Sequence, residues 1–244
     1  MYSPNIYRKF SLSGGAAAYD DFTAKVSVSG NIVGTSLDFE DFLAIDDSTT
    51  IARFDAHYSF NRRHRVDASY YDIRRSGSRT ISEDIVFGDV TIPAGTVQSF
   101  FDTQIFKLAY RYNFVADTRT VIGASFGAHL MGIDIGVSNE EFAVEEDFKV
   151  AAPLPLLGLH GAYALSDTWS LNASYEFLKF DIEAYRGFIG DLRLTVEHDT
   201  FEHFGWGIGF NGFKVDGHIE GDGPLEADLE YGYQGLMLYL RGYF

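Results

Sequence analysis

The stretch Gly235-Leu-Met-Leu-Tyr-Leu-Arg-Gly-Tyr-Phe244 carries the pattern that decides the fold. Successive side chains of a β-strand point to opposite faces. One face of this stretch is therefore apolar, with Leu236, Leu238, Leu240 and Phe244. The other face is mixed, with Met237, Tyr239, Arg241 and Tyr243. We predict a β-strand that has one oily side and ends on an aromatic residue.

The same alternation recurs upstream, in segments of the length that crosses a bilayer as a tilted strand, about 9–11 residues. These segments are residues 53–60, 65–73, 104–114, 121–131, 156–165, 169–177, 191–200 and 204–211. Short turns are predicted at 61–64, 115–118, 166–168 and 201–203, and longer connections at 20–48, 74–99, 132–152, 186–190 and 214–227. With a first strand over 9–19, this alternation of short and long connections predicts ten strands. Eight strands would require merging two hairpins, and twelve would require residues 22–43 to enter the membrane.

Composition narrows the class of protein. Cysteine is absent, which excludes a disulfide framework and a thiolate metal site. No run of about 18 apolar residues occurs, which excludes a transmembrane helix. The net charge of −16 argues against nucleic acid as a partner. The first residues lack the features of an export signal, so we interpret the chain as a form from which the signal was removed.

The predicted fold is all-β: an antiparallel up-and-down transmembrane β-barrel formed by residues 1–244 as a single domain. A soluble antiparallel sandwich would also alternate, but with oily residues inside and charges outside. It would not explain why aromatic residues recur beside the short turns. We predict that a lipid-facing girdle is formed by Phe60, Phe114, Tyr163, Trp169, Phe204, Trp206 and Phe244.

With this pattern and its terminal Phe244, the sequence resembles the small outer membrane β-barrel proteins of Gram-negative bacteria, such as the OmpA and OmpW types. The resemblance implies that the last strand carries the signal read by the barrel insertion machinery. It also implies short periplasmic turns, long extracellular loops, periplasmic termini, and contact with outer membrane lipid and lipopolysaccharide. Because closure of a barrel removes free strand edges, we expect a monomer.

If the oily faces contact lipid, the polar faces line the lumen, since Lys or Arg on the lipid side would cost about 2–4 kcal/mol. The predicted lumen charges balance, six cations against six acids: Arg53, Arg65, Lys107, Arg111, Arg193 and Arg241, with Asp55, Asp67, Glu176, Asp191, Glu197 and Asp199. His57, His129, His160, Asn172 and Asn211 add hydrogen-bonding groups. Two interpretations stay open: an ion-pair network that plugs the barrel, and a narrow water-filled passage with a charged constriction.

The excess of acidic residues lies in three segments: 20–48, 132–152 and 214–230. We predict no cofactor, although carboxylates there suit divalent cations such as calcium. The weak candidates for a metal site are Glu140, Glu141, Glu145, Glu146 and Asp147. Arg74 and Arg75 are predicted to lie just above the membrane and to pair with lipid phosphates.

The leading functional hypothesis is a non-enzymatic barrel with a charge-plugged lumen and a surface, membrane-structural or interaction role. The first alternative is a narrow channel for small solutes. The second is an outer membrane hydrolase of the omptin type, which uses paired Asp and an Asp–His couple at the external rim. Only Asp216 and His218 suggest such a couple here, and a single Asp-x-His is expected by chance among so many acids.

Overall fold

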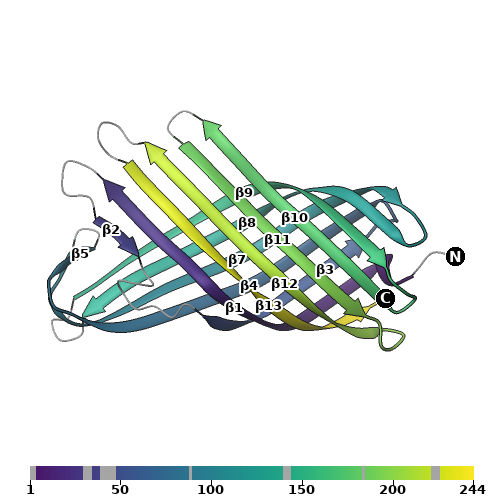
Figure 1. Ribbon diagram of the computed structural model, residues 1–244, viewed down its shortest axis with the longest axis horizontal. Coiled ribbons are helices and arrows are strands. Elements are labelled where there is room, and N and C mark those ends of the chain that lie inside the picture. Colours follow the sequence, from purple (N-terminus) through teal and green to yellow (C-terminus); the bar gives the residue numbers. More distant parts are fainter. Residues whose placement is uncertain are drawn as a thin grey trace.

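The computed structural model describes residues 4–29, 35–38, 48–87, 90–139, 144–182, 185–220 and 226–244. Ten long antiparallel strands form a closed barrel (Figure 1). They are β1 (Phe10–Ser29), β3 (Thr49–Ser59), β4 (His64–Ile81), β7 (Gly95–Ala116), β8 (Thr120–Asn139), β9 (Val144–Ala164), β10 (Trp169–Ile182), β11 (Tyr185–His198), β12 (Phe204–Glu220) and β13 (Glu226–Tyr243). Three short strands and one 3-10 turn complete the described elements: β2 (Thr35–Asp38), β5 (Ile85–Phe87), β6 (Val90–Ile92) and η1 (Pro4–Ile6).

Each long strand pairs with its neighbour in the sequence, and β13 returns to pair with β1. The last residue takes part in this closure, because the Phe244 amide donates to the Phe10 carbonyl at 2.9 Å. The two rings stack on the outside, with centroids 6.5 Å apart. Gly235 lets β13 approach β1 closely, since a Cβ there would lie 2.0 Å from the Ala18 carbonyl oxygen. The predicted ten-stranded up-and-down barrel is thus confirmed, with both termini at the short-turn end (Figure 1).

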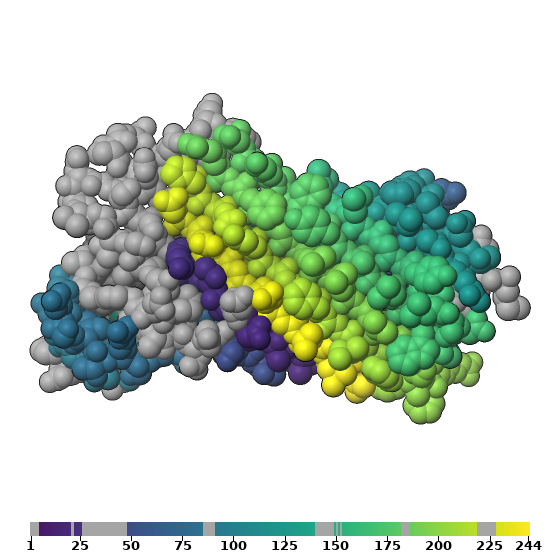
Figure 2. Space-filling view, in the orientation of Figure 1, coloured from purple at the N-terminus to yellow at the C-terminus, as the bar shows by residue number. Residues whose placement is uncertain are grey.

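An apolar belt surrounds the outer wall toward the short-turn end, where aromatic rings are visible on the surface (Figure 2). Its middle is aliphatic, and Leu159 and Leu238 are both 60% exposed. Of the girdle residues, Phe60, Phe114, Tyr163, Trp169, Phe204 and Phe244 are exposed on this wall. Trp206 is half-buried, with its ring 5.7 Å from that of Trp169. Oily residues therefore face outward, opposite to the arrangement of a soluble sandwich.

The strands extend farther than the alternation predicted. The structure places in strands several ranges that we expected in loops, and these continue the walls of the barrel: residues 74–81, 95–99, 132–139, 144–152, 186–190 and 214–220. Within the expected loop 20–48, β1 continues to Ser29 and pairs antiparallel with β2. Four of the ten long strands, β1, β7, β8 and β9, have 20 or more residues, about twice the length needed to cross a bilayer. No described helix has the length and apolar character needed to cross a membrane.

Beyond the belt, the polarity of the wall inverts. Inward side chains become apolar and outward ones polar, because that part of the wall no longer faces hydrocarbon. The inward set there includes Ile73, Val97, Phe101, Ile133 and Tyr231, all buried. The lumen therefore contains charged residues at the level of the belt and a hydrophobic core toward the long-loop end.

Candidate functional site

A hydrogen-bonded charge network crosses the lumen at the level of the belt. Arg193 of β11 binds Asp55 of β3 with both terminal nitrogens, at 2.8 and 3.0 Å. Ser69 also donates to this carboxylate, at 2.6 Å. Such two-pronged contacts between Arg and a carboxylate are the geometrically specific form of an ion pair. This pair connects opposite walls and fills the lumen between them.

The network continues through Arg53 and Asn211. Arg53 Nη1 donates to Asn211 Oδ1 at 2.9 Å and to the Tyr19 hydroxyl at 3.2 Å. Asn211 Nδ2 in turn donates to Asp191 Oδ1 at 2.8 Å. Because Asn211 both accepts and donates, it joins the Arg53 group to a second cluster around Lys107.

Lys107 of β7 is the cation of that second cluster. Its ammonium contacts Glu176 Oε2 closely and lies 3.3 Å from Asp191 Oδ2. The two carboxylate side chains are each 3% exposed. Ser125 adds a hydrogen bond to Glu176 at 3.4 Å. Two buried carboxylates thus depend on a single buried ammonium group.

This cluster includes the ligand atoms of a potential metal site. His129, Glu176 and Asp191 offer ligand atoms within 4.8 Å of one another, all buried. His129 Nε2 lies 3.7 Å from Glu176 and 3.6 Å from Asp191. However, Lys107 already supplies positive charge to both carboxylates, so a metal ion would have to displace its ammonium group. The two carboxylates therefore already have a cation, while the buried ring nitrogens of His129 have no hydrogen-bond partner among the described residues.

Aromatic residues cover the network on its long-loop side. Tyr71 and Tyr233 join their hydroxyls at 2.8 Å, and Arg53 lies 4.5 Å over the Tyr71 ring. Phe101 stacks on Tyr231, with centroids 5.4 Å apart and planes 7° apart. Both of these rings have no exposed surface. We call Tyr71, Phe101, Tyr231 and Tyr233 the aromatic cap.

The N-terminal segment lies across the short-turn end. Asn5 is buried, and its side chain donates to the carbonyls of Ser166 and Trp169 at 3.0 and 3.1 Å. Arg8 binds Asp199 at 2.7 Å. The same carboxylate is contacted closely by Arg241, which also binds Glu197. Residues 4–8, which precede the first predicted strand, therefore belong to the lumen structure.

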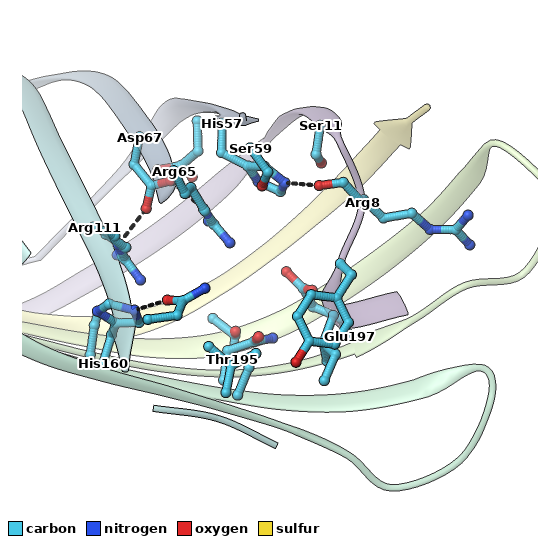
Figure 3. A pocket seen from close by; sticks show the side chains of 18 of the residues that line it. Arg8, Ser11, His57, Ser59, Arg65, Asp67, Arg111, His160, Thr195 and Glu197 are labelled. Carbon is cyan, nitrogen blue, oxygen red and sulfur yellow. Dashed lines mark hydrogen bonds and ion pairs between the residues drawn. The ribbon is translucent and has the colours of Figure 1, made fainter. Parts of the chain in front are cut away.

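Between this segment and the charge network lies a cavity of about 590 Å³ (Figure 3). Asn61 and Arg62, in the exposed turn after β3, are among its lining residues, so the cavity opens at the short-turn end. His57 lines it too, with Nε2 3.4 Å from the Arg8 carbonyl oxygen. Arg65 and Arg111 stand opposite each other on β4 and β7. Both bind Asp67 through Nε, Arg111 at 2.6 Å and Arg65 more closely.

The predicted lumen residues thus divide into three groups. The network holds Arg53, Asp55, Lys107, Glu176 and Arg193; the cavity wall holds His57, Asp67 and Arg111; the N-terminal side holds Glu197 and Arg241. Sequence reasoning missed the aromatic cap and Asn5. The signal for the cap was present, because the alternation of β4 and β7 continues beyond the belt.

Other predictions at the long-loop end fare differently. The prediction that Arg75 lies at the lipid phosphates is wrong. Arg75 is buried, and its guanidinium lies 4.1 Å over the Phe22 ring inside the barrel. Its neighbour Arg74 does point outward and binds Asp72 at 2.8 Å. The metal candidates Glu140 and Glu141 lie outside the described residues. The remaining candidates, Glu145, Glu146 and Asp147, belong to β9 and not to a loop.

The outer wall above the belt carries charged pairs. Lys214 binds Asp216 at 3.2 Å and Glu230 at 3.5 Å, and these hydrogen bonds raise its pKa. His218 bonds Asp228 at 2.6 Å, so it pairs with β13 and not with Asp216. A groove of about 560 Å³ lies beside this couple. These residues face away from the lumen.

No known protein family and no curated protein sequence matches this chain. Among solved structures, it is similar to the outer membrane protease OmpT from Escherichia coli, with a TM-score of 0.58 and 9% identity over 98% of both chains. Weaker similarities include the attachment invasion locus protein Ail of Yersinia pestis (TM-score 0.38, 12% identity, 96% of this chain and 98% of that one). The outer membrane protein OprG from Pseudomonas aeruginosa gives a TM-score of 0.39 and 12% identity over 96% of this chain and 95% of that one. The fold is that of an outer membrane β-barrel.

Proposed function

We propose that the protein resides in a bacterial outer membrane as a closed, non-enzymatic barrel with a surface, membrane-structural or interaction role. The belt supports the membrane location, since lipid is the solvent in which so many exposed apolar side chains are stable. The short turns and both termini face the periplasm, and the long-loop end faces outward. Phe244 and the closing strand carry the signal for the insertion machinery.

The observation that carries the closed state is the double obstruction of the lumen. The ion pair of Asp55 with Arg193 crosses it at the level of the belt. Above that pair, Phe101 and Tyr231 are stacked with no exposed surface. A conducting pore would need water along this path, and these rings leave none beside them. The function of a closed barrel then depends on its outer surface and not on transport through the lumen.

Lipid and lipopolysaccharide are the proposed partners of the outer wall. Paired charges such as Lys214 with Asp216 lie above the belt, near the expected height of the lipid headgroups. Divalent cations would bridge the acidic loops to lipid phosphates. With its edges removed by closure, the barrel functions as a monomer.

The test is uptake of small sugars into liposomes that contain the refolded protein, followed by light scattering as the liposomes swell. The proposal predicts the swelling rate of protein-free liposomes. A refolded conducting porin serves as the positive control. Swelling with arabinose above the protein-free rate would contradict the closed state and favour the narrow channel.

A hydrolase is the second candidate, favoured by the hydrogen bond between His218 and Asp228 beside the outer groove. Peptides and lipid A are the substrates to test. Cleavage that disappears in His218→Ala, in a variant with unchanged thermal stability, would replace the non-enzymatic role. We expect no such cleavage, because the carboxylates of this groove are mixed with cations, and the adjacent Lys214 binds Asp216 and Glu230. The groove is lined by four acids and three cations: Asp181, Asp216, Asp228 and Glu230, with Lys25, Lys179 and Arg186.

A further inference from the structure

The lumen holds equal numbers of predicted cations and acids, but the two signs are unevenly distributed within it. The cluster around Lys107 has two carboxylates for one ammonium group. The cavity wall shows the opposite, because Asp67 is the carboxylate bound by both Arg65 and Arg111. These two arginines are direct cross-strand neighbours, an arrangement that is destabilising unless an anion separates them. The cavity wall therefore carries a local excess of positive charge.

The contacts of the two arginines leave donors available. Asp67 is held through the Nε atoms, so the terminal nitrogens of Arg65 and Arg111 form no hydrogen bond with the described residues. Both guanidinium groups reach into the open space of Figure 3. Each offers four further N–H groups in the planar geometry that matches oxyanions.

Two buried polar atoms around the cavity are also unsatisfied. His160 Nε2 donates to Asn113 Oδ1 at 2.7 Å, which leaves its buried Nδ1 as an acceptor with no partner among the described residues. The buried Nδ2 of Asn172 is a donor and has no partner among the described residues either. Buried polar groups are normally hydrogen-bonded, so two unsatisfied ones around one cavity indicate a missing ligand or ordered water.

We propose that this cavity is a binding site for a small phosphate-type oxyanion, held between Arg65 and Arg111. The volume of about 590 Å³ admits inorganic phosphate and leaves room for the organic part of a compact phosphate ester. The opening at Asn61 and Arg62 would admit the anion from the short-turn side, which is the periplasm in the proposed orientation. Binding itself is independent of whether the barrel is closed, so the two proposals fail separately.

The experiment is titration of the refolded protein with inorganic phosphate, followed by phosphorus NMR and by the shift in thermal midpoint. Sodium chloride of matched ionic strength controls for screening, and acetate tests a planar carboxylate. We expect saturable phosphate binding and a raised midpoint. Arg65→Gln and Arg111→Gln should each weaken binding about ten- to a hundredfold, the value of one charge-assisted contact. The matched control is Arg74→Gln, at an exposed arginine of the outer wall, which should leave binding unchanged.

Asp67→Asn gives the sharpest result, because it removes the competing carboxylate. Phosphate should bind this variant more tightly than the wild type and should raise its midpoint further. A purely structural role for Arg65 and Arg111 would not produce tighter binding. The proposal is overturned if the wild type shows no phosphate effect beyond that of chloride, or if both arginine variants, folded by circular dichroism, bind phosphate as well as the wild type.

To separate the possible sources, glycerol phosphate is compared with vesicles containing phosphatidic acid. Competition by soluble glycerol phosphate that depends on Arg65 indicates a free anion as the natural ligand. Competition by the vesicles alone would contradict the lumen site and transfer the phosphate effect to the outer wall.

Discussion

Replacing Lys107 by Met tests the lumen network at the residue on which two buried carboxylates depend. Methionine has a similar length and keeps the apolar stem, but it removes the charge. The variant leaves Glu176 and Asp191, each 3% exposed, without their cation. Neither carboxylate can turn to solvent, because each is enclosed by the wall.

The cost follows from that burial. Removing one partner of a buried ion pair costs about 3–5 kcal/mol, because it leaves an uncompensated charge in a medium of low polarity. The matched control is Lys149→Met on the outer wall. Lys149 binds Asp134 at 3.2 Å, but its side chain is 65% exposed, so its loss should cost no more than about 1 kcal/mol.

The assay is urea unfolding of the refolded barrel in lipid vesicles, followed by tryptophan fluorescence. The reasoning predicts a clear loss for Lys107→Met, a small one for Lys149→Met, and recovery of most of the loss when Glu176→Gln and Asp191→Asn are added to Lys107→Met. Equal losses for the two lysine variants would refute a buried, mutually dependent cluster. So would a triple variant as unstable as the single one.

Three further predictions concern the seam where β13 pairs with β1, the aromatic cap and the wall above the belt. Gly235→Ala places a Cβ against the Ala18 carbonyl oxygen and should destabilise the barrel by about 1–3 kcal/mol in the same urea assay, whereas an unchanged midpoint would mean that the seam is looser than described. Phe101→Ala, at a fully buried ring of the cap, should cost about 3–5 kcal/mol, and a loss below 1 kcal/mol would show that the cap is not packed. Burial raises the pKa of Asp102, so its folded-state pKa exceeds the unfolded value and its carboxylate weakens the fold at neutral pH. Asp102→Asn should therefore gain up to about 1 kcal/mol at neutral pH, and the gain should vanish below about pH 4, where the wild-type carboxyl is protonated in both states; a variant less stable than the wild type at neutral pH would contradict the sign.

The alternation of side chains was sufficient to predict the barrel, its strand number and its belt. In Gln104 to Phe114, period-two patterning leaves one orientation compatible with lipid, because Lys107 and Arg111 cannot face hydrocarbon. Four short turns then determine the strand number. Local sequence is enough here because each strand meets the same two environments.

The limits of the strands and the composition of the upper lumen were harder to predict. Above the belt the outside becomes polar and the inside apolar, so the same alternation continues with its meaning reversed. Residues 95–99 and 132–139 were interpreted as loops for that reason. Arg75 shows the same effect, because a charged residue above the belt was assumed to face outward although Arg74, its neighbour, already occupied that face.

The arrangement of the lumen charges depends on contacts across the barrel that no local pattern contains. Arg193 and Asp55 are 138 residues apart in the sequence. Their pairing depends on the stagger of the strands around the barrel. The sharing of Asp67 by two arginines has the same origin, and an equal count of cations and acids concealed it. The N-terminal segment carries no periodic signal, so its place across the short-turn end could not be foreseen.

The central claim is that the lumen is closed by the charge network and the aromatic cap. Single-channel conductance of the refolded protein in a planar bilayer tests it most directly, scanned from about pH 4 to about pH 8. The account predicts silence across the whole range. Steady conductance would contradict it and make the lumen charges a selectivity filter, and conductance that appears only at low pH would show a pore that opens when the lumen acids are protonated.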